Sequence, residues 1–138
     1  LNIHDNDSHG FYVGGRNVLI EGSRIYRAGL RDVPWCGGGF KGCGYGIQVR
    51  KPDKPVGNFV IRNNVIYDNF VGGIVLVHGG GDLIYNNVIY GNKSAGIIVG
   101  TGGNKIFNNT IVNNEQGGIY VNTPVSIEVR NNIIVGGA

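Results

Sequence analysis

The sequence is poor in several residue types, and each shortage excludes a class of protein. Only 15% of its 138 residues are charged, Trp occurs once, Met is absent and there are two cysteines. So low a charge content is untypical of a helical protein, and two cysteines are too few for a disulfide scaffold. No apolar run approaches the roughly 20 residues of a membrane-spanning helix, so we expect no membrane span. The glycines have no three-residue period, which excludes collagen.

The residues in excess indicate strands joined by many turns. The chain contains 26 Gly and 18 Asn, together with 34 Val and Ile. Gly and Asn alone would be compatible with disorder, but so many β-branched residues favour a β-rich fold. The length predicts one domain over residues 1–138. The net charge of +3 comes without a basic stripe, so we expect no nucleic-acid partner.

An internal repeat of 22 or 23 residues extends along the chain. Its clearest copies are 61–69, 84–92, 106–114 and 129–135, and the first three are each followed by Gly-Ile. Apolar residues alternate within three short segments of each repeat, which is the period of a strand. Three short strands per repeat, with no helix between them, predict the coils of a parallel β-helix. About five to six coils would stack at the inter-strand spacing of about 4.8 Å.

Stacking converts the repeat into columns of equivalent residues. We expect the Asn column to form one tight turn with a left-handed backbone, and its amides to hydrogen-bond between coils. An outward column of aromatic residues is either a platform for sugar rings or simply suited to a strand surface, and we favour the second interpretation. The interior isoleucines are Ile3, Ile25, Ile66, Ile89, Ile111 and Ile134; the asparagines are Asn64, Asn87, Asn109 and Asn132; the aromatic residues are His4, Tyr26, Tyr67 and Tyr90.

One coil contains a long insertion at residues 29–45. It holds the only Trp and both cysteines, Cys36 and Cys43. Loops that leave a rigid scaffold commonly carry function, so activity is to be sought here first. Two cysteines without further ligands make a poor zinc site, and a disulfide that pins the loop is the better interpretation in an exported protein.

The motif Asn-Asn-x-Ile-x-x-Asn-x-x-x-Gly-Ile-x-Val resembles that of right-handed parallel β-helix repeat proteins of the pectate-lyase-like superfamily. The resemblance implies an all-β, right-handed, single-stranded solenoid, and covers essentially the whole chain. The superfamily includes polysaccharide lyases, epimerases and phage tailspikes. Residues 5–13 are also similar to a tract in alginate C5-epimerases, in which the matching histidine is His9. The Tyr-Gly-Phe-Asp-Pro-His tract of that family has no counterpart here.

By analogy with this superfamily, a polymer would bind on the outward face of the Gly-Ile-x-Val strands. Positions 75, 98 and 120 on that face carry no carboxylate, so we expect neither a metal site nor the acid pair of glycoside hydrolases. Polar residues gather instead on the first two coils. The candidate catalytic residues are His9, Tyr45 and Arg50, and the candidate substrate-binding residues are Tyr12, Arg31, Asp32, Lys41 and Gln48.

Within this set, His9 or a tyrosine would remove the proton beside a uronate carboxylate, and a cation would neutralise the developing charge. That chemistry needs no cofactor and corresponds to β-elimination or epimerisation. We therefore expect a secreted or cell-surface domain that binds or processes an acidic polysaccharide. The alternative is a non-catalytic structural or adhesive segment of a surface, filament or tailspike protein. We also expect a segment of a longer solenoid, whose uncapped coils could associate end to end.

Overall fold

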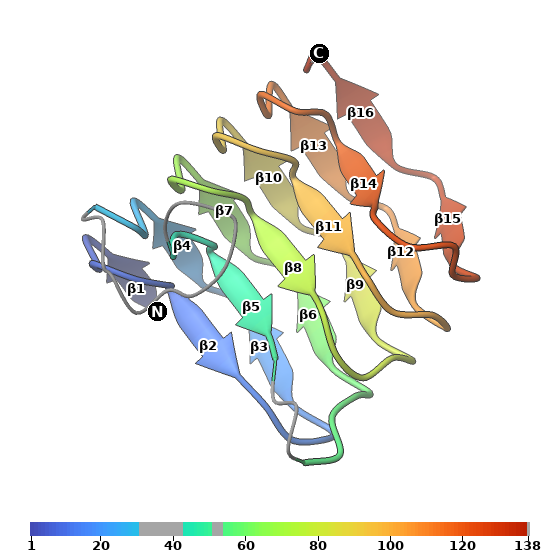
Figure 1. Cartoon of the computed structure of the whole chain (residues 1–138). Coiled ribbons are helices and arrows are strands. Elements are labelled where there is room, and N and C mark those ends of the chain that lie inside the picture. The colour runs from blue at the N-terminus through green and yellow to red at the C-terminus, as the bar shows by residue number, and fades with distance from the viewer. Residues whose placement is uncertain (31–42, 51–53, 138) are drawn as a thin grey trace.

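The computed structural model describes residues 1–30, 43–50 and 54–137, and these residues form a three-sided stack of coils (Figure 1). All of the regular elements in these described ranges are strands of three residues. The two termini lie at opposite ends of the stack. Within the described part of the chain there is no helix long and apolar enough to cross a membrane.

The strands form three parallel sheets, one along each side of the stack. The first sheet consists of β1 (Asn2–His4), β4 (Arg24–Tyr26), β7 (Val65–Tyr67), β10 (Val88–Tyr90), β13 (Thr110–Val112) and β16 (Ile133–Val135). The second consists of β2 (Phe11–Val13), β5 (Ile47–Val49), β8 (Ile74–Leu76), β11 (Ile97–Val99) and β14 (Ile119–Val121). The third consists of β3 (Leu19–Glu21), β6 (Val60–Arg62), β9 (Leu83–Tyr85), β12 (Lys105–Phe107) and β15 (Glu128–Arg130). Each coil therefore contributes one strand to each sheet, which confirms the predicted parallel β-helix.

The register places equivalent residues of successive repeats directly over one another, as predicted. Ile3 pairs with Ile25, Ile25 with Ile66, and the column continues to Ile134 through Ile89 and Ile111. From Ile25 to Ile111 these side chains are fully buried. The β-branched residues of all three sheets thus form one continuous core, whose largest member is Phe59.

The Asn column is confirmed as a buried hydrogen-bonded ladder, although the left-handed residue is its neighbour. The Nδ2 of Asn64 donates to Oδ1 of Asn87 over 3.1 Å, and Asn87 donates to Asn109 in the same way over 3.0 Å. The positive φ angles belong instead to the preceding asparagines, including 55° at Asn63 and 54° at Asn86. The prediction was wrong on this point, because the first Asn of each pair makes the turn and the second points inward.

A second Asn ladder, which the sequence reasoning did not identify, lies at the next corner. Asn69 donates to Asn92 over 2.9 Å, and Asn92 donates to Asn114 over 2.8 Å. All three side chains are at most 1% exposed. The two ladders pair the backbone N–H groups at their corners, which would otherwise be buried without partners.

The glycine that precedes the second-sheet strands is required by close packing. A Cβ on Gly73 would collide with the carbonyl oxygen of Gly96 and lie 2.7 Å from Cγ2 of Ile89. The equivalent glycines, Gly10, Gly46, Gly96 and Gly118, face the isoleucine of the following first-sheet strand in the same way. The glycine of each Gly-Ile pair is therefore required because the packed interior leaves no room for a Cβ at that position.

The outward aromatic column is confirmed as a stack whose ring faces are occupied by one another. Successive centroids of His4, Tyr26, Tyr67 and Tyr90 are 4.8, 4.8 and 4.9 Å apart, with interplanar angles of at most 15°. Sugar rings bind to exposed ring faces, but the inner faces of this stack are covered. The geometry favours the interpretation that these rings suit a strand surface.

The two ends of the insertion at residues 29–45 lie next to each other on the β-helix. A Cβ on Gly29 would collide with the carbonyl oxygen of Cys43 and lie 2.6 Å from Cα of Gly44. Cys43 is disulfide-bonded. Residues 31–42, which include Cys36, lie outside the described residues.

We predict that Gly73→Ala lowers the free energy of unfolding by about 1–3 kcal/mol, because the added methyl group overpacks the interior beside Ile89. Gly102→Ala is the matched control, since the closest atom to its Cβ would be 3.5 Å away. Urea unfolding followed by circular dichroism measures both variants. Equal stability of the two variants would contradict the packing explanation.

We predict that Asn87→Ala costs about 1–3 kcal/mol for each buried group that it leaves unpaired. Those groups include the carbonyl oxygen of Ile61 and the N–H of Asn64. Asn86→Gly should stay within about 1 kcal/mol of the wild type, because glycine readily adopts the φ of 54° found there. Chemical denaturation checks both values, and an Asn87→Ala protein as stable as the wild type would refute the role of the ladder.

Candidate functional site

Three aromatic side chains meet on the first two coils, at the edge of the second sheet. His9 lies in the turn before β2, Tyr12 lies on β2, and Tyr45 lies two residues before β5. The His9 ring stacks on Tyr45 with a centroid separation of 5.7 Å and lies 5.5 Å from the ring of Tyr12. The fold therefore brings His9 and Tyr45 into contact, although 36 residues separate them.

His9 is held as the neutral imidazole. Burial, reinforced by the charge of Arg50, lowers the pKa of His9 to about 4. Its Nδ1 accepts a hydrogen bond from the backbone N–H of Tyr45 over 3.3 Å. A neutral imidazole whose Nδ1 accepts carries its proton on Nε2, so the free edge of His9 is a hydrogen-bond donor.

Tyr45 and Arg50 complete the polar side of this cluster. Burial raises the pKa of Tyr45, so its phenol stays protonated over the physiological range. Arg50 directly follows β5, and its backbone N–H donates to the carbonyl oxygen of Val13 over 2.9 Å. Its side chain is exposed. The site therefore combines an exposed cation, a neutral donor and aromatic surface.

The outward face of the second sheet is open only in part. Tyr12 is 56% exposed, but its partner in the next coil, Gln48, is only 6% exposed. Val75, one coil further along, is 5% exposed. Tyr12 and Arg50 are thus exposed on these coils, whereas Gln48 is buried.

The other predicted substrate-binding residues, Arg31, Asp32 and Lys41, lie outside the described residues. In the ranges that the structure describes, no group of three or more His, Cys, Asp and Glu side chains is arranged to hold a metal ion. Among the described residues, the cluster consists of His9, Tyr12, Tyr45 and Arg50.

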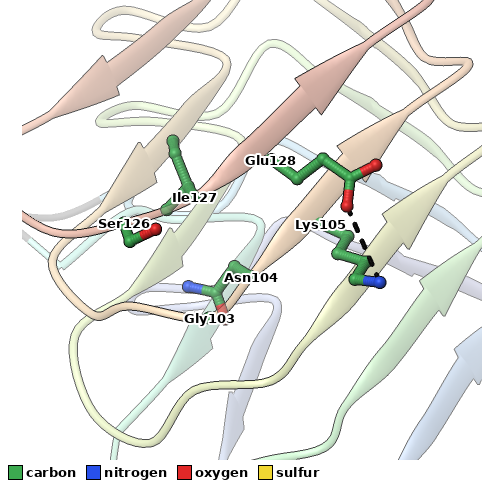
Figure 2. Close-up of a pocket in the computed structure, with 6 residues that line it drawn as sticks. All are labelled: Gly103, Asn104, Lys105, Ser126, Ile127 and Glu128. Atoms are coloured by element: carbon green, nitrogen blue, oxygen red, sulfur yellow. Dashed lines mark ion pairs between the residues drawn. The ribbon is translucent and has the colours of Figure 1, made fainter.

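A shallow pocket lies far along the stack from this cluster, between β12 and β15 (Figure 2). It has a volume of about 220 Å³, and an ion pair of 3.6 Å between Lys105 and Glu128 spans one side. Asn104 lines it, but its amide is already bonded to Thr101 and to the N–H of Asp82. The pocket offers no free buried polar group to a ligand.

Sequence reasoning found the register of this site but missed two of its properties. The contact between Tyr12 and His9 could have been inferred, because the turn at Gly10 brings together residues three apart. Nothing in the sequence indicates that Gln48 is buried, because an outward position in the repeat is expected to be exposed. Burial of such a residue depends on atoms outside its own sheet.

We predict that His9 titrates near pH 4 in the folded protein and that Arg50→Gln raises this value by removing a nearby positive charge. Unfolded histidine titrates near 6.5, so the unfolded state binds the proton first and stability falls as the pH drops from about 6.5 to about 4. NMR of the imidazole protons measures the titration. Arg130→Gln, on the far coil, is the control, and a midpoint near 6.5 for His9 would contradict its burial.

Comparison with known proteins bears on the whole chain. A family model described as the right-handed beta helix region matches residues 1–138. Searches of curated proteins and of solved structures found no match. The family match agrees with the three parallel sheets and their repeated register. The chain therefore belongs to the right-handed β-helix family.

Proposed function

We propose that this β-helix domain binds an acidic polysaccharide at the first two coils. The observation that carries the proposal is the convergence of Tyr12, His9 and Arg50. Tyr12 offers an exposed ring, His9 offers a neutral donor, and Arg50 offers an exposed guanidinium close enough to affect the pKa of His9. Aromatic surface with a few fixed polar groups is the usual composition of a ligand site.

The chemistry of these groups suits a uronate residue. A guanidinium binds a carboxylate through two parallel hydrogen bonds, which makes Arg50 the anchor for the acid group. The apolar face of a sugar ring would pack on Tyr12, and the Nε2–H of His9 would donate to a hydroxyl oxygen. Arg31, Asp32 and Lys41, which sequence analysis assigns to substrate binding, would add charge from the insertion.

Binding is better supported than proton transfer. A general base needs a free lone pair near the proton that it removes, whereas Nδ1 of His9 already accepts from Tyr45. With a pKa of about 4, His9 is also a weak base. A Tyr45 phenol with a raised pKa resists conversion to the phenolate. A β-elimination or epimerisation at His9, Tyr45 and Arg50 would require these properties to change when substrate binds.

An extracellular location accompanies this proposal. A polysaccharide ligand is met mainly outside the cell, and disulfides persist in oxidising compartments. The disulfide bond at Cys43 is in keeping with that environment.

The second candidate function is that of a non-catalytic structural or adhesive segment. It is favoured by the apolar outward positions of β8 and β11, where Val75 is buried and Ile98 is half-buried. Side chains of that kind form a packing surface and offer nothing to a sugar hydroxyl.

We predict that the domain is retarded in affinity electrophoresis through gels containing alginate, pectate or a glycosaminoglycan, and that Tyr12→Ala and Arg50→Gln each reduce the affinity about tenfold. A loss of about 1.4 kcal/mol, appropriate to one charged hydrogen bond or one aromatic contact, gives that factor. Raising the salt concentration should weaken binding to acidic polymers.

Tyr120→Ala is the matched control. Tyr120 occupies the same outward column as Tyr12 and is equally exposed, at 55%, but lies on the last coil of the second sheet. Its substitution should leave binding unchanged. An ultraviolet assay for unsaturated products separates a lyase from a binding domain. Failure to bind any acidic polymer would overturn the proposal and favour the structural alternative.

A further inference from the structure

One buried carboxyl group stands apart from the candidate site. Asp82 lies at the corner that joins β8 to β9, and its side chain is fully buried. Its Oδ1 accepts from the backbone N–H of Phe59 over 2.9 Å. Its Oδ2 is buried and has no hydrogen-bond partner among the described residues.

The next coil also carries a polar side chain at this position, and its hydrogen bonds show how such a side chain is paired there. Asn104 is the equivalent of Asp82, because Lys105 pairs with Leu83. Its Oδ1 accepts from the N–H of Asp82 over 3.0 Å, and its Nδ2 donates to the carbonyl oxygen of Thr101 over 2.8 Å. Asn104 therefore uses one acceptor and one donor at this position. A carboxylate offers only acceptors, whereas a protonated carboxyl group offers both.

Among the described residues, no charged group holds Asp82 in its ionised form. Burial raises the pKa of Asp82, and the hydrogen bond from Phe59 opposes that shift. The titratable and charged groups on the elements packed around Asp82 make no contribution to its pKa. In the described part of the chain these are His78 and Tyr85 on its own coil, Arg62 bonded to Glu21 and Tyr85, and Lys105 paired with Glu128.

We propose that Asp82 is a proton-binding group built into this corner, held as the neutral acid in the folded chain, so that the solenoid becomes less stable as the pH rises. The proton allows Asp82 to replace the asparagine found in the next coil. Its loss places an unpaired charge inside the corner beside Phe59. The structure thus contains a pH-sensitive position that is independent of ligand binding at His9 and Arg50.

The direction of the effect follows from linkage. The unfolded chain releases the Asp82 proton near the ordinary value of 3.8, and the folded chain releases it at higher pH. Over that interval the folded state binds more protons, so stability falls as the pH increases and then levels off above the folded pKa. Asp82→Asn removes this dependence and keeps the donor.

The test compares thermal unfolding of wild type and Asp82→Asn from about pH 3.5 to about pH 8. The variant should unfold roughly 3–8 °C higher at pH 8, because it removes one buried unpaired group, and the difference should shrink toward zero near pH 3.5. Carbon-13 NMR of the Asp82 carboxyl group should show that its pKa in the folded protein lies above the ordinary value of 3.8.

Asp68→Asn is the matched control, because Asp68 is an exposed aspartate at another corner. It should produce no such trend, and His78→Gln should leave the trend in place. Asp82→Ala, which also removes the charge, should lose the pH dependence even though it is less stable overall. A stability difference between wild type and Asp82→Asn that is the same at every pH, with ordinary titration of the Asp82 carboxyl, would overturn the proposal.

Discussion

Hydrogen bonding between successive coils is the constraint on which the rest of this structure depends. A strand of three residues has no stability by itself, so each coil must pair its backbone N–H and C=O groups with the coils on either side. Parallel pairing at about 4.8 Å places every residue above its equivalent. The interior must therefore be filled by stacked isoleucines, and the corners by amides that hydrogen-bond to the coils on both sides, as Asn87 and Asn92 do.

The same constraint shapes the outer surface. Each outward side chain packs against the equivalent side chains of the adjacent coils, which leaves less of its surface for a ligand. Tyr26, Tyr67 and Tyr90 cover each other's faces, and Lys93 bonds to Glu115 over 2.6 Å. A binding site can develop only where the columns are interrupted. The first two coils meet that condition, because His9 and Arg50 have no counterparts of similar chemistry in the later coils.

Most of the fold could be predicted because each column repeats several times. Ile89 alone is compatible with many folds, but its recurrence every 22 or 23 residues beside Asn-Asn and Gly-Ile is typical of a coil. The left-handed turn was predicted at the wrong member of the Asn pair. Both residues are asparagines, so the spacing cannot distinguish the turn at Asn86 from the inward amide of Asn87.

The sequence by itself determined the coil, its strands and the column to which each side chain belongs, because these follow from periodicity alone. Only the tertiary structure decided that His9 is neutral, that Gln48 is buried and that Oδ2 of Asp82 lacks a partner. Each of these properties depends on atoms from other coils and on how completely they exclude water. Desolvation and hydrogen bonding depend on which atoms are neighbours in space, and the repeat pattern does not specify those neighbours.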